Sequence, residues 1–147
     1  MASKDLKNNI GVVNLLEPQD LAHTDTASAW LDTLGFESAV IAVQVGALTG
    51  VDGSNYVTPV LQESDTTAAA DATSVASADI EGAFTKIDST SEDSVVQYVG
   101  YKGTKRYVRV NMDYTSTGIT AGVVGIIGIV SNGREYPITA PDADAAT

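Results

Sequence analysis

The chain alternates between short apolar segments and clusters of Gly, Asn, Asp and Ser, with a turn signal about every 8–12 residues. In Ser38–Leu48 and Arg106–Tyr114, apolar side chains recur at every second position, which is the period of a strand with one buried face. We therefore predict an all-β fold, an antiparallel, jelly-roll-like β-sandwich that forms a single domain.

The predicted organisation is a flexible N-terminal arm (1–9), the β-sandwich (10–138) and a disordered acidic tail (139–147). Pro18 is expected to end the first strand, and Pro59 to mark an edge strand or a bulge. Residues 65–79 are expected to form a long loop, with one short strand around residues 73–76. The expected strands are Ile10–Leu16, Thr26–Phe36, Ser38–Leu48, Tyr56–Ser64, Gly82–Ser89, Asp93–Gly103, Arg106–Tyr114, Thr120–Val130 and Arg134–Ile138.

Two tight hairpins are predicted from turn chemistry. The three residues GTK (103–105) connect the expected strand Asp93–Gly103 to the expected strand Arg106–Tyr114, a length that suits a tight hairpin with Gly103 in the turn. Asn132-Gly133 is a preferred dipeptide for a two-residue type I′ turn before Arg134–Ile138. The segment Val123–Val130 is apolar on both faces, so we expect its outer face to be covered, for example by a neighbouring subunit.

Charge and composition disfavour several functions. The net charge is −11, so an acidic surface repels nucleic-acid backbones. There is no cysteine, and the longest apolar run, Ala121–Val130, is about half of what spans a bilayer. The N-terminal segment lacks the apolar core of a secretory signal. We expect no nucleic-acid partner and no membrane association.

We find no motif for catalysis, a metal or a cofactor, and predict a protein that is not an enzyme and binds none of these. His23, the single histidine, is expected in an exposed loop. The segment that starts at Asp52 lacks the pattern of a calcium loop, although a weak cation site there stays open. The glycines at 122, 125 and 128 fit neither a dinucleotide nor a phosphate-binding loop.

The block Val95–Tyr114 holds four of the eight Lys and Arg residues among tyrosines and valines. It could be a protein interface, since Tyr and Arg are enriched at binding hot spots, or a solvated pair of strands. A stacking platform for single-stranded nucleic acid is the least favoured of the three interpretations.

The order of several short motifs resembles small structural proteins of tailed bacteriophages, the capsid decoration (cement, head-stabilising) proteins. The motifs are DLKNNI (5–10), GFESAVIAVQVG (35–46), LQESD (61–65), GAF (82–84) and VGYKGTKRYVRV (99–110), followed by a Gly- and Val-rich strand. The resemblance covers about residues 5 to 131. It implies a β-rich, self-associating domain without catalytic residues, bound to the outside of an icosahedral shell.

On this basis we expect a virion protein, assembled in the host cytoplasm, that binds the major capsid protein and forms a homo-oligomer, with a trimer favoured. The expected interface residues come from the N-terminal arm and the basic block: Leu6, Ile10, Val12, Val13, Tyr101, Lys102, Lys105, Arg106, Tyr107 and Arg109. Two alternatives stay open. One is another virion component, such as a head–tail connector, tail or minor spike protein. The other is a carbohydrate-binding β-sandwich, which would need an exposed aromatic platform, although the sequence around Trp30, the single tryptophan, favours a core position.

Overall fold

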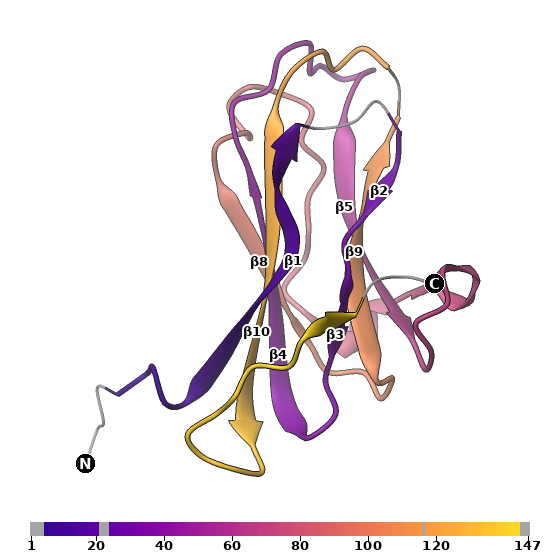
Figure 1. The fold of residues 1–147 in the computed structure, drawn as a ribbon. Helices are drawn as coiled ribbons and strands as arrows, with labels where there is room; N and C mark the ends of the chain where they lie inside the picture. The colour runs from indigo at the N-terminus through magenta and orange to yellow at the C-terminus, as the bar shows by residue number, and fades with distance from the viewer. Residues whose placement is uncertain (1–4, 21–23, 116, 145–147) are drawn as a thin grey trace.

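The computed structural model describes residues 5–20, 24–115 and 117–144 as two antiparallel sheets packed face to face (Figure 1). This arrangement confirms the all-β sandwich. The first sheet has five strands, in the order β1 (Ile10–Asp20), β10 (Val123–Gly133), β4 (Phe36–Val45), β8 (Val96–Tyr101) and β7 (Ile80–Glu81).

The second sheet has six strands. Five follow the order β11 (Ala143–Asp144), β3 (Trp30–Asp32), β9 (Tyr107–Tyr114), β5 (Val57–Ser64) and β6 (Thr73–Ser74), and β2 (Thr26–Ala27) also pairs with β9. The connection between β5 and β7 contains two short 3-10 turns, η1 (Ala69–Asp71) and η2 (Ser77–Asp79). β6 in this connection confirms the short strand expected around residues 73–76.

The core lies between the sheets and follows the strand period. On β4, the inward side chains Ile41, Val43 and Val45 are all buried, as the alternation predicts. On β9, Val108 and Val110 are fully buried and face them from the second sheet. Burial of these branched side chains is the main stabilising contribution to the fold, at roughly 1.5–3 kcal/mol for each one.

The two prolines behave differently from one another. Pro59 lies in β5, which is not the edge strand because β6 pairs with it at Gln62 and Glu63 and Ile87 bridges it at Val57; Pro59 lies between these pairings, where no strand is paired with it on that side. Pro18 does not end β1, which continues to Asp20 through two register shifts against β10. The reason is that β1 is itself the edge of its sheet, where a missing N–H breaks no ladder bond.

The predicted hairpin around Gly103 is wrong. β8 pairs with β4 and β7 in the first sheet, whereas β9 pairs with β3 and β5 in the second, so residues 102–106 form a crossover between the sheets. The length of the connection suits a hairpin. The buried Tyr101 side chain instead lies across the end of the sandwich, where its hydroxyl bonds Glu63 of the second sheet and the Lys105 N–H of the connection.

The predicted hairpin at Asn132-Gly133 is also wrong. Both residues belong to β10, where Gly133 pairs with Phe36 of β4, and Asn132 has a positive φ of 52°. Residues 134–137 form bends instead of a strand, and the Arg134 N–H donates to the carbonyl of Gly35. β10 already has strand neighbours on both sides, β1 and β4, so no place is left for a hairpin partner.

Two further segments differ from expectation. Residues 82–89 form no strand beyond a single bridge at Ile87. The backbone N–H and carbonyl of Thr85 bond the side chain of Gln97 on β8, in place of a strand backbone. Part of the acidic tail is ordered: Ala143 in β11 pairs with Leu31 of β3, so the sandwich extends past residue 138. The boundaries of the predicted N-terminal arm remain a prediction.

Candidate protein-docking surfaces

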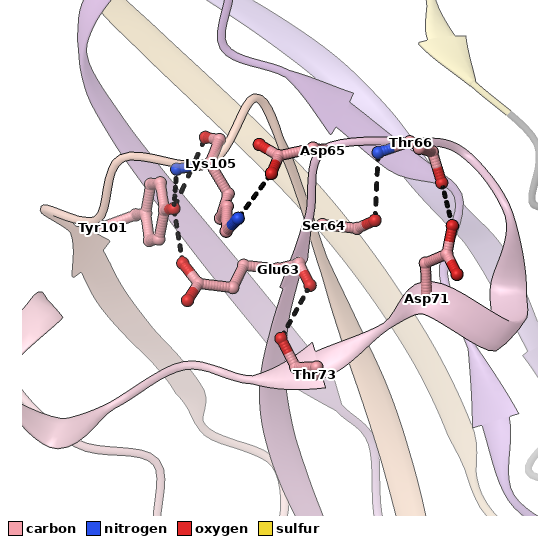
Figure 2. Close-up of polar contacts among 8 residues, drawn as sticks. All are labelled: Glu63, Ser64, Asp65, Thr66, Asp71, Thr73, Tyr101 and Lys105. Carbon is pink, nitrogen blue, oxygen red and sulfur yellow. Dashed lines mark hydrogen bonds and ion pairs between the residues drawn. The ribbon is translucent and has the colours of Figure 1, made fainter.

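Tyr101 holds the crossover between the sheets (Figure 2). Its hydroxyl donates to Glu63 Oε2 at 2.6 Å and accepts the N–H of Lys105 at 2.9 Å. Burial and the neighbouring Glu63 carboxylate both raise the pKa of the Tyr101 hydroxyl well above its usual value. The segments LQESD and GYKGTK, far apart in the sequence, therefore meet in space.

The exposed basic side chains of the crossover are each paired with a carboxylate of the same chain. Lys102 Nζ lies 2.8 Å from Glu81, and Lys105 forms an ion pair with Asp65. These hydrogen bonds lower the pKa of Glu81 and raise that of Lys105. Each pair is solvent-exposed, so it contributes little to stability and a charged partner can compete for it.

Arg106 makes two hydrogen bonds to a single carboxylate, that of Asp32. Its Nε and Nη2 donate to the two oxygens of Asp32 at 3.0 and 2.7 Å, a bidentate geometry. Burial raises the pKa of the Asp32 carboxyl, but the hydrogen bonds from Arg106 and the Leu34 N–H outweigh it and leave that pKa below its usual value. The Arg106 guanidinium also lies 4.8 Å from the ring centre of Tyr107.

Arg109 is not available to a partner, because only 6% of it is exposed. Its guanidinium stacks on Trp30 at 4.4 Å from the ring centre, and its Nε donates to Gln62 at 2.9 Å. Burial lowers the pKa of Arg109 from its ordinary value. Trp30 is fully buried and lies outside the main core, and its indole N–H donates to the Thr67 carbonyl. The side chain of Trp30 thus offers no exposed platform for a sugar.

The loop that covers this cluster has its own internal bonds (Figure 2). Thr66 donates through its hydroxyl to Asp71 at 2.7 Å, and its backbone N–H donates to the buried Ser64 hydroxyl. Thr73 donates to the Glu63 carbonyl at 3.3 Å. The low-complexity, acidic segment that follows β5 is thereby folded against the outside of the second sheet.

The described part of the N-terminal arm forms a turn beside β10. The side-chain amide of Asn8 donates to the Asp5 carboxylate at 2.6 Å, and its backbone carbonyl accepts the N–H of Ile138 at 3.0 Å. Leu6 is 63% exposed, and Ile10 is half-buried at the start of β1. Val13, also predicted to contact a partner, belongs to the core instead, since its side chain faces inward on β1.

The arm and the crossover lie at the same end of the sandwich, the lower end in Figure 1. The Thr33 N–H donates to the carbonyl of Arg106, which joins the β3–β4 turn to the crossover. The Arg134 N–H donates to Gly35 on the same turn, and the residues after it bond the arm through Ile138. We call this region the arm end. Its large exposed apolar side chains are Leu6, Leu34 and Tyr136.

A second surface is the outer face of the first sheet, here called the bare face. Cross-strand registers place Val12, Ile129 and Val40 in one row, and Asn14, Ile127, Ala42 and Tyr98 in the next. Gly125, Gln44 and Val96 form a third row. No Asp, Glu, Lys or Arg occurs in 10–16, 38–45, 96–101 or 123–133. The apolar outer side of β10 was predicted from sequence, and none of the described residues covers its middle, where Ile127 is 40% exposed.

In the part of the chain that the structure describes, no group of three or more His, Asp or Glu side chains is arranged to hold a metal ion. That part also contains no helix with the length and hydropathy needed to cross a membrane. His23 lies outside the described residues. The chain matches no protein-family model and no curated protein.

Sequence reasoning singled out the arm, the basic block and one strand of the bare face, but not the crossover itself, the arm-end residues Leu34 and Tyr136 or the contribution of β8. Leu34 precedes a glycine with φ 89°, and a large apolar residue beside a turn glycine is a signal for an exposed anchor. Tyr98 is 69% exposed although it alternates with buried Val99. That alternation marks an outward-facing aromatic on a strand.

Proposed function

We propose that this chain is a non-enzymatic structural protein of a tailed-phage virion, a decoration protein that docks with its arm end on the outside of a shell of major capsid protein. The carrying observation is that the arm and the basic crossover, separated by about ninety residues, lie at the same end of the sandwich and are linked there through the β3–β4 turn and the residues that follow β10. The resemblance of the motif order to decoration proteins supplies the biological context.

The chemistry of the arm end suits a protein partner. Leu6, Leu34 and Tyr136 expose between 57% and 63% of their surface, and apolar and aromatic side chains of this kind anchor interfaces. Lys102 and Lys105 lie in the crossover at the same end, and exposed ion pairs hold their charges. A partner carboxylate can exchange with Glu81 or Asp65 at low cost, which gives the contact a salt dependence.

The experiment mixes the purified protein with undecorated shells assembled from the major capsid protein of the phage that encodes it. Sedimentation then measures how many copies bind per capsid subunit. We expect binding at a fixed ratio to the capsid subunits, and loss of that binding in a Leu34→Asp, Tyr136→Asp double variant. The matched control is Val95→Asp, a 45% exposed apolar position before β8, at the opposite end of the sandwich. Unchanged occupancy in the double variant would remove the arm end from the proposal.

The basic crossover is tested separately with Lys102→Glu and Lys105→Glu, which alter exposed side chains. Arg109 is unsuitable for this test, since a charge reversal at a buried, stacked position disrupts folding. A protein that binds in a few copies at a single vertex, instead of across the shell, would be a head–tail connector or tail component.

A further inference from the structure

We propose that the bare face binds a second copy of this chain, so that two sandwiches pack back to back through the outer faces of their first sheets in a two-fold dimer. The proposal concerns a different surface from the arm end and is independent of docking on a shell. Its basis is the contrast between this face and the rest of a highly acidic molecule.

The bare face is apolar where a lone sandwich would be polar. Antiparallel sheets with one solvated face alternate apolar and polar side chains. Here the outward positions include Val12, Val96, Tyr98 and Ile127, which expose 52%, 54%, 69% and 40% of their surface. Val123 at the end of β10 adds another 43% exposed side chain. A contiguous apolar surface on four adjacent strands is characteristic of an interface.

The outer face of the second sheet provides an internal comparison. There the same chain covers Trp30 and Arg109 with the loop after β5, through the bond from the indole to Thr67. That sheet therefore needs no external partner for its aromatic residue. Among the described residues, no loop lies across the middle rows of the bare face, where Ile127 and Tyr98 remain exposed.

Charge identifies the partner as a second copy. The chain carries a net charge of −11, so two copies repel each other wherever acidic surfaces meet. The strands of the bare face carry no charged residue within 10–16, 38–45, 96–101 and 123–133. The charges on the rows lie at the rim: Glu81, ion-paired with Lys102, at one end, and Asp20, which pairs with Val123, at the other. Two such faces meet without burying any charge, and a two-fold contact needs only this self-complementary patch.

The size and shape of the face fit a dimer of modest strength. Four strands, about seven residues long on this face, outline roughly 500 Å² per copy, or about 1,000 Å² for a pair, near the lower limit for specific interfaces. A hollow lies over Gly125 and Ala42, beside the protruding Ile127. A bulky side chain of the second copy fits this hollow, as ridges and hollows interlock between packed sheets. We therefore expect a concentration-dependent dimer and not a trimer.

The first test is the solution mass as a function of protein concentration, by sedimentation equilibrium without shells. The chain has a mass of 15.2 kDa, so a dimer has twice this value. We expect a transition from monomer to dimer in the micromolar range, and at least a tenfold weaker association for Ile127→Asp. Tyr98→Ser, at a 69% exposed position, is a milder variant that keeps the fold if Ile127→Asp does not. Tyr136→Ser at the arm end is the matched control and keeps the wild-type mass.

The second test uses the absence of cysteine from the chain. Single variants Ile127→Cys and Leu34→Cys are oxidised at equal concentration. Rapid covalent dimer formation from Ile127→Cys but not from Leu34→Cys supports the back-to-back arrangement. A monomer at all concentrations up to the millimolar range, or a dimer that survives Ile127→Asp and Tyr98→Ser, overturns it. Because neither test contains a shell, their failure leaves the shell-binding proposal intact, and a bare-face variant that loses only shell binding would assign this face to the capsid protein instead.

Discussion

The hydroxyl of Tyr101, at the end of β8 in the first sheet, donates to the carboxylate of Glu63 on β5 of the second sheet, across 2.6 Å. The same oxygen accepts the Lys105 N–H, so one side chain satisfies a backbone donor of the crossover and connects the two layers. Since the crossover also carries Lys102 and Arg106, this contact positions the basic part of the arm end.

Tyr101→Phe should destabilise the fold by about 1–3 kcal/mol, because it leaves the Lys105 N–H and the Glu63 carboxylate without their common partner. Urea unfolding followed by tryptophan fluorescence measures the effect. Tyr98→Phe is the matched control, as its ring is 69% exposed, and should change the unfolding free energy by less than about 0.5 kcal/mol. Equal stability of the two variants would show that the Tyr101 hydroxyl does not hold the crossover.

Tyr114→Phe should act in the opposite direction. The Tyr114 hydroxyl is buried without a hydrogen-bond partner among the described residues, and burial raises its pKa above the usual value. Removing an unsatisfied polar atom recovers its desolvation cost, so we expect a gain of about 1 kcal/mol in the unfolding free energy. A loss of stability in the same urea assay would indicate an ordered water bonded to this hydroxyl.

The raised tyrosine pKa values also set the response to alkali. A group whose pKa is higher in the folded state stabilises the fold below its unfolded pKa and loses this contribution as the pH rises through the folded pKa. Because both hydroxyls ionise less readily in the folded state, the free energy of unfolding should fall above about pH 10. Phenylalanine has no hydroxyl to ionise, so in the Tyr101→Phe and Tyr114→Phe variants the free energy of unfolding should fall less steeply above this pH.

Gly103→Ala tests how closely the crossover packs on Tyr101. A Cβ at this position would lie 2.4 Å from the Tyr101 hydroxyl oxygen, much closer than packing allows. We expect a destabilisation of about 1–3 kcal/mol, typical of overpacking. Gly53→Ala in the β4–β5 connection is the control, because nothing lies within 4 Å of its Cβ. A neutral Gly103→Ala would indicate that the crossover moves away freely from the tyrosine ring.

Strand periodicity predicted the core well, because alternation reports directly which face of a strand is buried. Ile41 and Val43 on β4, and Val108 and Val110 on β9, were placed correctly from residue type and parity alone. Parity also placed Arg109 on the outer face of its strand, but it could not show that the loop after β5 folds over that face and buries the guanidinium.

Sheet membership was the information that the sequence lacked. The short connection at Gly103 is as suitable for a hairpin as for a crossover, and only long-range pairing of β8 with β4 and of β9 with β5 decides between them. The same limit hid the bare face, since Tyr98 and Ile127 are 29 residues apart and become neighbours only through Ala42. The placement of the arm and the crossover at one end of the sandwich depends on these pairings too.

Asp32 supplies one acid-dependent contribution to the stability of the arm end. Its pKa is below the usual value because hydrogen bonds from Arg106 and the Leu34 N–H outweigh the effect of burial. A group with a lowered folded pKa stabilises the fold above its unfolded pKa, about 3.9 for aspartate, and loses this contribution as the pH falls through the folded value. Since the Arg106 side chain is 44% exposed, we expect the contribution at neutral pH to be about 1 kcal/mol or less.

Asp32→Asn should therefore lower stability at pH 7 and remove part of the fall in stability below about pH 4, so that the two proteins converge in acid. The measurement is the urea midpoint between neutral pH and about pH 3. Asp113→Asn, at an exposed position of β9, is the control and should retain the acid response that Asp32 provides. If Asp32→Asn instead stays parallel to the wild type down to the lowest pH, the bidentate pair with Arg106 does not persist in solution.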